Sequence, residues 1–428
     1  MPAIPSATMR RVITAAAIGN FVEWFDFAIY GFLATLIAKQ FFPHQDPQAA
    51  LLETFAVFAV AFALRPLGGL FFGRLGDRIG RKLTLALTIL LMAAATTVVG
   101  LLPTHAQVGL WAAVGLTLAR CVQGFSAGGE YAGACAYVME HSPPGRRATL
   151  GAFLPVSTFS AFAAAAVVAF ALDTALGQQA MADWGWRVPF IAAAPLGLIG
   201  MYLRSRLDES PTFDAQRPAT HQHHAPIAQA LRSHGGVIAC LSTFIAVTAL
   251  SFYTFTTYFA TYLQVVGGMT RPQSLLVTVV ALCAAVVLCP FAGRYADAVG
   301  RRRTMVTVSG LVLATVYPSF MLAQQGSLAL ALVGVTLQAL AAVLSGVVTV
   351  ALLSESFPTR IRYTASAMAY NLAYTVFGGT APLMATWLIG VTGNRLAPAF
   401  YLMGVALLAL VGGLRLPESS HLALSEVR

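Results

Sequence analysis

Five ionisable side chains lie inside long apolar runs in the first half of the chain, namely Glu23, Asp26, Arg65, Arg120 and Glu130. A charged group in the middle of a membrane helix costs about 2.5–3.5 kcal/mol on insertion scales, so it marks a function or a buried ion pair. The apolar runs 237–270, 304–354 and 363–394 of the second half contain no Asp, Glu, Lys or Arg. We therefore expect the first half to carry the charge-dependent chemistry.

Arg120 is the first candidate for a contact with substrate, because a guanidinium group is always charged and binds a carboxylate through two parallel hydrogen bonds. Gln123 and Tyr131 follow it and add polar groups to the same stretch. Arg65 precedes Pro66 in the middle of another run, where it either lines the same site or neutralises a carboxylate. For Arg120 too, the alternative is a purely structural ion pair.

Glu23 and Asp26 lie three residues apart, so they are neighbours on one helix face. Two carboxylates that close disfavour joint ionisation, and a carboxylate that takes up a proton near neutral pH is what proton coupling requires. Asp26 is the first candidate for the coupling site, followed by Glu23 and Glu130. The alternative is a salt bridge to Arg65 or Arg120 in which no proton is exchanged.

The second half offers hydroxyl and amide groups in place of charges. Tyr253 and Thr257 are four residues apart, so their hydroxyl groups share one helix face and need partners. Tyr370 and Asn371 form a second polar patch, where an amide facing lipid would be unfavourable. We predict that these four residues complete the substrate site; packing of the aromatic rings is the alternative.

The composition excludes an ordinary soluble domain. Of the 428 residues, 58% are hydrophobic and 10% are charged, against about 25% charged in average globular domains. The net charge of +10 arises from short Arg clusters between apolar runs, which fits membrane topology better than a nucleic-acid surface. The five cysteines lie in apolar runs without CxxC spacing, and no nucleotide-binding or hydrolase motif occurs. We expect no metal, cofactor, nucleic-acid partner or enzymatic activity.

Twelve apolar runs are long enough to be membrane helices, at residues 12–38, 51–73, 83–103, 108–139, 148–173, 187–204, 237–265, 273–293, 304–323, 326–353, 364–391 and 396–415. Most loop Arg and Lys residues share a side with both termini, and only Lys39, Arg187, Arg271 and Arg395 fall in the opposite loops. The positive-inside rule then predicts that both termini are cytoplasmic. We expect the first run to remain as a span, because it is too long for a cleavable signal peptide.

Two sequence signatures recur, which predicts a duplicated six-helix unit. The stretch 73–82 recurs 220 residues later at 293–302, and the stretch 140–147 recurs 215 residues later at 355–362. We predict an N-terminal bundle at 1–205, a cytoplasmic linker at 206–236 and a C-terminal bundle at 237–428.

We also predict that the recurring loops are gates. Their glycines permit close backbone approach, and an aspartate there can cap a helix N-terminus or pair with arginine. A solvated loop is the alternative. The residues assigned to gating are Gly73, Asp77, Arg78, Gly80, Arg81, Asp297, Arg301, Glu140, Arg147, Glu355 and Arg362.

The loop pattern G-x3-D-[RK]-x-G-[RK]-[RK], present at 73–82 and weakened by Ala298 in its second copy, resembles that of the major facilitator superfamily. The motifs at 19–27, 65–69, 120–131, 184–190 and 207–211 look like those of the metabolite:H+ symporter family, which includes carriers for alpha-ketoglutarate, citrate, shikimate and proline/betaine. Residues 252–258 look most like the alpha-ketoglutarate permease, and 357–363 more like the proline/betaine carriers. The resemblance implies two bundles that the loop motif holds closed at the cytoplasmic side.

These observations predict an all-α membrane protein with twelve transmembrane helices in two pseudo-symmetric six-helix bundles. We expect a proton-coupled symporter of the cell inner membrane that imports a small organic acid, such as a di- or tricarboxylate, by alternating access. Arg120 and Arg65 favour an anion. The expected partners are the substrate, protons and membrane lipid, and the expected working unit is a monomer.

Two alternatives stay open. A zwitterionic osmolyte such as proline or glycine betaine is the second substrate class, since aromatic rings such as that of Tyr253 can cradle a quaternary ammonium group. A non-transporting membrane receptor is the third possibility, and the intramembrane charges argue against it. The sequence does not distinguish protons from sodium as the coupling ion. Because the chain ends at Arg428, we expect no C-terminal coiled coil.

Overall fold

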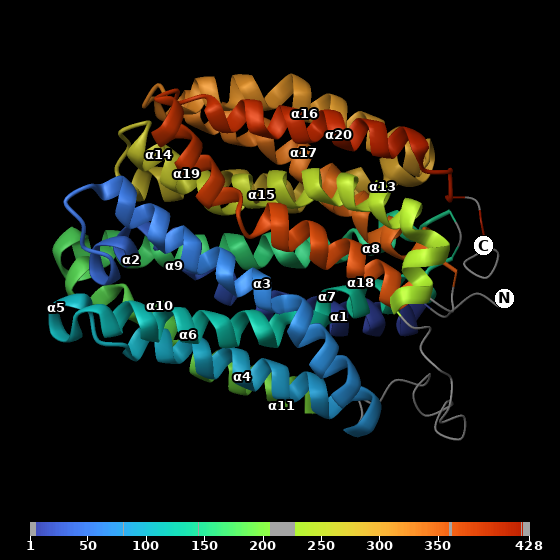
Figure 1. Cartoon of the computed structure of the whole chain (residues 1–428), viewed down its shortest axis with the longest axis horizontal. Coiled ribbons are helices and arrows are strands. Elements are labelled where there is room, and N and C mark those ends of the chain that lie inside the picture. The colour runs from blue at the N-terminus through green and yellow to red at the C-terminus, as the bar shows by residue number, and fades with distance from the viewer. Residues whose placement is uncertain are drawn as a thin grey trace.

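The computed structural model describes residues 6–79, 81–143, 145–205, 227–358, 362–420 and 422. Every regular element in this part of the chain is a helix, and Figure 1 shows the helices as long rods that run in roughly the same direction. Among the described residues, eight helical stretches are long and apolar enough to cross a membrane. The pair α1 and α2, bent by 63°, adds a ninth if it counts as one span.

The first half of the chain forms the following elements: α1 (Ser6–Phe32), α2 (Ala34–Phe41), α3 (Pro47–Ile79), α4 (Arg81–Leu101), α5 (His105–Val108), α6 (Leu110–Ser126), η1 (Ala127–Gly129), α7 (Glu130–Glu140), α8 (Arg147–Gly151), α9 (Phe153–Ala180), η2 (Met181–Gly185), α10 (Arg187–Ile191) and α11 (Ala193–Ser205). The second half forms α13 (Ile227–Tyr253), η3 (Thr254–Tyr258), α14 (Phe259–Val265), α15 (Arg271–Val299), α16 (Arg301–Ala323), α17 (Leu328–Glu355), α18 (Arg362–Ala373), η4 (Tyr374–Gly378), α19 (Ala381–Thr392) and α20 (Ala397–Arg415).

In chain order, the described elements make up the twelve predicted crossings, and several crossings are interrupted. The first bends between α1 and α2, and the fourth consists of α6, the 3-10 turn η1 and α7. The π-helical turns η3 and η4 lie inside the seventh and eleventh crossings. Such turns within α-helices are frequent at functional sites, and both carry or adjoin aromatic residues of the site described below.

Local sequence explains how α15 and α16 follow one another. α15 begins at a capping box in which the Thr270 N–H donates to Gln273 Oε1 at 3.1 Å. It ends at Gly300, whose φ of 93° lies in the region that favours glycine. Gly300 alone allows α16 to begin directly at Arg301. As a result, Asp297 at the end of α15 and Arg301 at the start of α16 lie close together.

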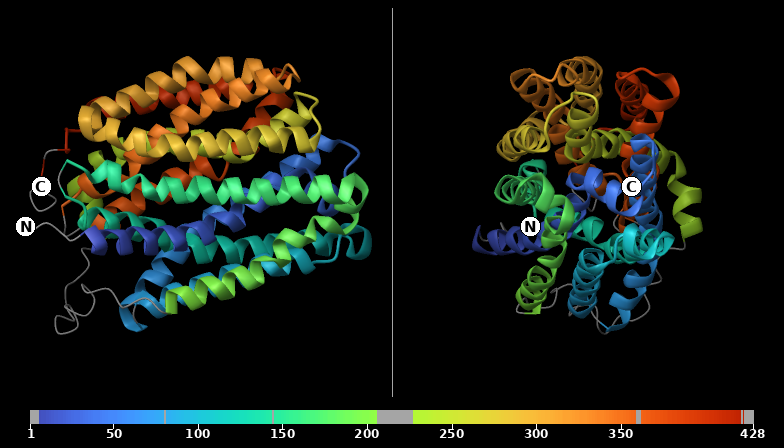
Figure 2. Two further views of the ribbon diagram at one scale, coloured as in Figure 1. Left: turned by 180° about the vertical axis from the view of Figure 1, so that it is seen from behind. Right: turned by 90° about the vertical axis from the view of Figure 1, so that its left-hand side faces the viewer.

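The two halves of the chain gather on opposite sides of the molecule. In Figure 1, α4, α6, α10 and α11 occupy one side, while α13, α16, α17 and α20 occupy the other. The helices α9 and α15 pack against each other at the boundary between the halves, as the reverse view in Figure 2 also shows. Side chains from both halves therefore meet along the centre of the molecule.

The predicted linker at 206–236 falls mostly outside the described residues, at 206–226. Its remaining residues belong to α13, which begins at Ile227 and contains one non-helical residue, His234. The division into bundles at 1–205 and 237–428 stays a prediction.

Candidate functional site

Five aromatic rings form a closed circuit at the centre of the molecule. Trp24 on α1 contacts Tyr131 on α7 with a centroid distance of 6.1 Å, and Tyr131 stacks on Tyr370 of α18 at 5.0 Å. Tyr370 stacks on Tyr374 of η4 at 4.0 Å, Tyr374 contacts Tyr253 of α13 at 6.2 Å, and Tyr253 returns to Trp24 at 6.3 Å. Both halves of the chain contribute, so the circuit lies where relative motion of the halves would reshape it.

A polar residue fixes the orientation of Trp24. Its indole N–H donates to Asn20 Oδ1 at 2.9 Å, and Asn20 Nδ2 donates to Thr158 Oγ1 of α9 at 2.8 Å. Both Asn20 and Trp24 are buried. Because an indole can only donate, this acceptor holds the ring at a defined angle within the circuit.

The Arg65 guanidinium lies against the circuit. Its Cζ atom is 5.5 Å from the Trp24 ring centroid, 4.5 Å from Phe27 and 4.3 Å from Phe62. Arg65 is 2% exposed, and its Nε and Nη2 atoms have no hydrogen-bond partner among the described residues. A buried cation with unused donors beside aromatic faces can bind an anionic group.

Arg120 is joined to Asp26 through two other residues. Arg120 Nη1 donates to Gln123 Oε1 at 2.8 Å, and Gln123 Nε2 donates to Thr96 Oγ1 at 2.6 Å. Thr96 Oγ1 in turn lies 3.0 Å from Asp26 Oδ2. The Arg120 Cζ atom also lies 4.1 Å from the centroid of the Tyr30 ring. The side chains thus form a chain from a guanidinium to a carboxyl group; Arg120 Nε and Nη2 have no partner in the described part.

The two carboxyl groups of α1 also line a small cavity. Glu23 and Asp26 are both buried, and they share this cavity with Thr88, Met92 and Ser126. Asp26 therefore takes part in the chain of hydrogen bonds to Arg120 and also lines the cavity. The side chain of Glu130, the third predicted coupling residue, lies outside the described residues.

The second half places hydroxyl groups beside the aromatic circuit. Among the described residues, Tyr253 Oη, Tyr370 Oη and Thr257 Oγ1 are buried without a hydrogen-bond partner. A buried hydroxyl group usually has a partner, so these groups are candidates for ligand contacts. Thr257 lies against α1, because a Cβ atom on Gly31 would come within 2.6 Å of its methyl group. Asn371 is half-buried.

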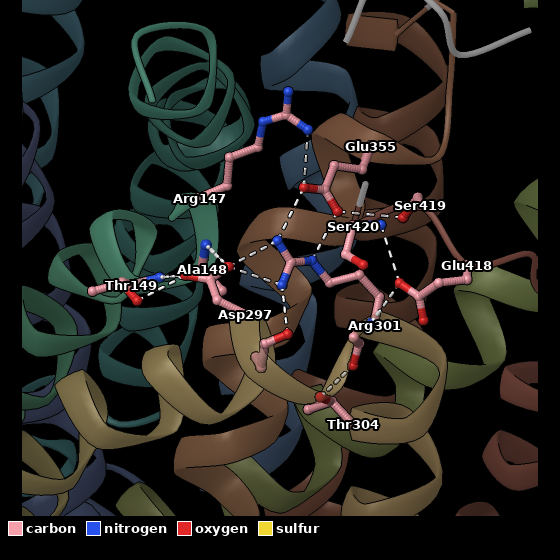
Figure 3. A network of polar contacts seen from close by, with 12 residues as sticks. Arg147, Ala148, Thr149, Asp297, Arg301, Thr304, Glu355, Glu418, Ser419 and Ser420 are labelled. Atoms are coloured by element: carbon pink, nitrogen blue, oxygen red, sulfur yellow. Dashed lines mark hydrogen bonds and ion pairs between the residues drawn. The ribbon is translucent and has the colours of Figure 1, made fainter. Parts of the chain in front are cut away.

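A dense polar network joins the two halves at one end of the molecule (Figure 3). Asp297 of α15 accepts hydrogen bonds from the backbone N–H groups of Ala148 and Thr149 of α8, at 3.0 and 2.8 Å. Arg301 donates to Asp297 at 3.1 Å and to Glu355 at 2.8 Å, and all three side chains are largely buried. We call the end that holds this network the network end.

The segment after α20 takes part in the same network (Figure 3). Glu418 accepts from the backbone N–H groups of Arg301 at 2.8 Å and Arg302 at 3.0 Å, at the start of α16. Arg147 of the first half donates to Glu355 at 3.3 Å and to the Leu422 carbonyl at 2.9 Å. Burial acts to raise the pKa of Glu418, but the backbone N–H groups of Arg301, Ser420 and Arg302 and the Ser420 side chain hold it below its usual value.

The opposite end, which we call the ion-pair end, has a simpler connection. Arg271, at the start of α15, forms an ion pair with Asp173 of α9 at 2.6 Å. Thr35 Oγ1 of α2 donates to Gln264 of α14 at 3.2 Å, and Gln48 of α3 donates to the Thr386 carbonyl of α19 at 3.1 Å. The helix pair α9 and α15 is thus clasped at both of its ends.

The structure places the predicted gating residues unevenly. Asp297, Arg301, Arg147 and Glu355 meet in the network, whereas Glu140 is exposed at the end of α7. Gly80 lies outside the described residues. The side chains of Asp77, Arg78, Arg81 and Arg362 lie outside the described part of the structure. The backbones of these residues and of Gly73 belong to α3, α4 and α18.

Several residues of the site were not among the predicted ones. Thr96 carries no charge, and nothing in its own span distinguishes it from other small polar residues. Asn20 carries no charge either, but it belongs to the motif at 19–27, which could have marked it. Glu418 could have been found from a repeat, because Glu209-Ser210 recurs as Glu418-Ser419 after the last helix of the second half. Asp173 could have been found as an acidic residue at the end of an apolar run.

Comparisons with known proteins identify the family. A family model described as Sugar (and other) transporter matches residues 12–233, and one described as Major Facilitator Superfamily matches residues 268–426. The proline/betaine transporter of Salmonella typhimurium is 35% identical over 98% of this chain and 85% of that protein. The chain belongs to the major facilitator superfamily. It is therefore a multi-pass membrane transport protein, and its twelve crossings are those of the major facilitator fold.

Other relatives of this major facilitator protein carry similar names. The glycine betaine/proline/ectoine/pipecolic acid transporter OusA of Dickeya dadantii is 37% identical over 98% of this chain and 85% of that protein. The ectoine/proline transporter ProP of Corynebacterium glutamicum is 36% identical over 98% of this chain and 86% of that protein. Among solved structures, the partially occluded inward-open xylose transporter XylE of E. coli aligns with a TM-score of 0.77 at 18% identity, covering 98% of this chain and 100% of that one. At that identity the likeness concerns the fold alone.

Proposed function

We propose that this chain is a proton symporter of a small zwitterionic solute of the proline or betaine type. The observation that carries the proposal is the closed circuit of Trp24, Tyr131, Tyr370, Tyr374 and Tyr253 with the Arg65 guanidinium against one of its rings. Such a solute has a cationic ammonium group and a carboxylate on one short skeleton.

The two kinds of side chain match the two ends of that solute. Aromatic faces attract a quaternary ammonium group through their quadrupoles, and several rings together form a cage. The unused donors of Arg65, and those of Arg120, can bind the carboxylate through charge-assisted hydrogen bonds. The partnerless hydroxyl groups of Tyr253 and Tyr370 can orient the bound molecule, since both lie on circuit residues.

The names of the relatives support a zwitterion over the predicted organic acid. The relatives from Salmonella typhimurium, Dickeya dadantii and Corynebacterium glutamicum are named for proline, betaine or ectoine. The organic-acid prediction depended on the charges of Arg120 and Arg65 and on the resemblance of residues 252–258 to the alpha-ketoglutarate permease. A ring of aromatic faces is of little use to a di- or tricarboxylate, whose charges would face the negative side of the quadrupoles.

We infer that Asp26 is the site of proton coupling. Its carboxyl group is buried, is linked to Arg120 through side chains and lines the small cavity, so it can respond both to protons and to the occupant of the site. We further infer that the network end is cytoplasmic, in agreement with the distribution of Arg and Lys, and that the membrane is the cell inner membrane. Opening the network end and the ion-pair end in turn would give alternating access.

Counterflow in proteoliposomes tests the proposal. Vesicles that contain purified protein are loaded with unlabelled solute, and uptake of labelled glycine betaine, proline, alpha-ketoglutarate and citrate is compared. We expect exchange of glycine betaine or proline, and a large loss of affinity for glycine betaine in Trp24→Leu but not in Trp24→Phe. Exchange of a dicarboxylate without exchange of either zwitterion would refute the proposal, and exchange of no solute would favour a receptor.

A further inference from the structure

We propose that Thr96 and Gln123 are positioning residues that carry the protonation state of Asp26 to Arg120 and so couple protons to the solute. The inference deepens the function proposed above and rests on it. No ion pair between Asp26 and Arg120 occurs among the described residues. The two groups communicate through one hydroxyl and one amide, whose hydrogen bonds form an unbroken line across α1, α4 and α6.

The Thr96 hydroxyl is the branch point of this line. It has one hydrogen and two acceptors within reach, Asp26 Oδ2 at 3.0 Å and the Met92 carbonyl at 2.9 Å. One hydrogen cannot serve both acceptors fully, so the hydroxyl group has two orientations. At the same time its oxygen accepts from Gln123 Nε2 at 2.6 Å, which links either orientation to the next residue.

The charge on Asp26 selects between the two orientations. When the carboxylate is ionised, Thr96 donates to it, which makes the Thr96 oxygen a better acceptor for Gln123, and the polarised amide holds Arg120 more firmly. When Asp26 carries a proton, its hydroxyl group donates to Thr96, and Thr96 turns its own hydrogen to Met92. The Thr96 oxygen then accepts two hydrogen bonds, so its bond to Gln123 weakens and Arg120 is released toward the carboxylate of the solute.

Other charged groups near Asp26 do not replace this path. Glu23 lies on the same helix and shares the cavity, and from α3 Arg65 lies against aromatic rings. The charged residue described within α9 is Asp173, which is paired with Arg271 at the ion-pair end.

The remaining elements packed on α1 add few groups of this kind. On α11, Tyr202 is exposed and the side chain of Arg204 lies outside the described residues; on α2, Lys39 is exposed. The lining that α4 gives to the cavity consists of Thr88, Ile89 and Met92. From α10, Arg187 donates to the carbonyl groups of Gly100 and Leu102. The turn η3 contributes the buried phenol of Tyr258, and α7 carries Glu130, whose side chain is outside the described residues. Arg120 is therefore the cation that the described hydrogen bonds connect to Asp26.

The coupling must be reciprocal, because binding free energies are linked. If a proton on Asp26 strengthens solute binding, the bound solute must strengthen proton binding by the same factor. The measurable consequence is that the half-saturating concentration of glycine betaine rises as the pH is raised. Removing the relay should flatten this dependence, which loss of folding or of a simple packing contact would not do.

The test uses full-length protein in proteoliposomes and measures the half-saturating concentration of glycine betaine in counterflow from mildly acidic to mildly alkaline pH. We expect wild-type protein to change by about tenfold over this range and Thr96→Val by less than about twofold, because Val keeps the shape but removes the hydroxyl group. Thr96→Ser should restore the wild-type profile. Thr97→Val is the matched control, since the Thr97 hydroxyl group donates to the Ala93 carbonyl of its own helix.

Gln123→Leu separates the relay from a direct effect on Asp26. Among the described residues no hydrogen bond joins Gln123 to Asp26, and Gln123 reaches it through Thr96. A flattened pH profile in this variant would therefore indicate the interrupted path to Arg120. The same variant serves if Thr96→Val is not recovered in folded form, which a thermal melt establishes. A wild-type pH profile in folded Thr96→Val or in Gln123→Leu overturns the proposal that Thr96 and Gln123 couple Asp26 to Arg120. If wild-type protein exchanges no zwitterion at any pH, the proposed function fails instead.

Discussion

The helix pair α9 and α15 is clasped at both ends, but by different means. At the network end, Asp297 accepts from two backbone N–H groups of α8 and from Arg301, which also holds Glu355. At the ion-pair end, the ion pair of Asp173 and Arg271 joins the same two helices. The hydrogen bonds of Thr35 to Gln264 and of Gln48 to Thr386 join the halves beside it. Both ends are thus closed around the aromatic circuit, with unequal numbers of bonds to break.

This inequality has a physical consequence for the transport cycle. Buried charges that lose one partner are costly, whereas an ion pair with a partly exposed member is weakened by solvent. Arg301 and Glu355 have fully buried side chains, while that of Arg271 is 15% exposed. In the absence of solute, the ion-pair end should therefore open more readily than the network end.

Asp297→Asn should have the largest effect. The substitution keeps the size of the side chain but removes the charge that Arg301 and the N-terminus of α8 share, at a cost of about 3–5 kcal/mol. We expect the network end to open and zwitterion accumulation to be lost. The distance between spin labels on the exposed residues Arg146 and Arg303, which lie in opposite halves, measures the opening.

Asp183→Asn is the matched control for this change. The Asp183 carboxylate is exposed and accepts a hydrogen bond from Gln179, which also belongs to the first half. This hydrogen bond therefore does not connect the two halves. The label distance should be as in the unsubstituted protein. An unchanged distance in Asp297→Asn as well would show that the network does not hold the end closed.

Asp173→Asn should have a smaller effect than Asp297→Asn and should open the ion-pair end instead of the network end. Arg271 is partly exposed and can turn to water when its partner is lost. We therefore expect the free-energy difference between open and closed protein to change by about 1–2 kcal/mol, which is roughly a tenfold change in their ratio. Labels on Gln178 and Gln325 report this end, and Arg271→Lys, which keeps the charge, is the control. Opening at the network end in Asp173→Asn would contradict the comparison.

The fold and the charged part of the site could be predicted from the sequence, because both follow from the cost of placing groups in lipid. Apolar runs must become helices, and charges inside them must face the interior, as Asp26, Arg65 and Arg120 do. These inferences need only the local composition of each run.

The contacts between distant residues could not be predicted in the same way. The sequence suggested that Asp297 caps a helix N-terminus or pairs with arginine, but nothing in it shows that the backbone N–H groups are those of α8 in the other half. Thr96 gains its importance from meeting Asp26 and Gln123, which lie on other helices. Asp173 and Arg271 each look like an ordinary boundary of a span, and only their distance of 2.6 Å makes them a pair.

Glu418→Gln should weaken the network end only slightly. The amide loses the charge that complements the N-terminus of α16 but can still accept a hydrogen bond from Arg301, so we expect a change of a few-fold in the open fraction. The labels on Arg146 and Arg303 again provide the measurement, with the exposed Glu53→Gln as control. An effect as large as that of Asp297→Asn would mean that the segment after α20, and not Asp297, closes this end.

The smallest expected effect is the response of the network end to acid. Because backbone N–H groups hold the pKa of Glu418 below its ordinary value of 4.5, its contribution is fully present above that value and is lost only as the pH falls through the lowered pKa. The distance between labels on Arg146 and Arg303 should therefore stay constant from neutral to mildly acidic pH in solute-free protein. In stronger acid, the difference between the unsubstituted protein and Glu418→Gln should disappear. If that difference already disappears in mild acid, Glu418 is not held in its ionised form by α16, and proton effects at the network end could not be separated from those at Asp26.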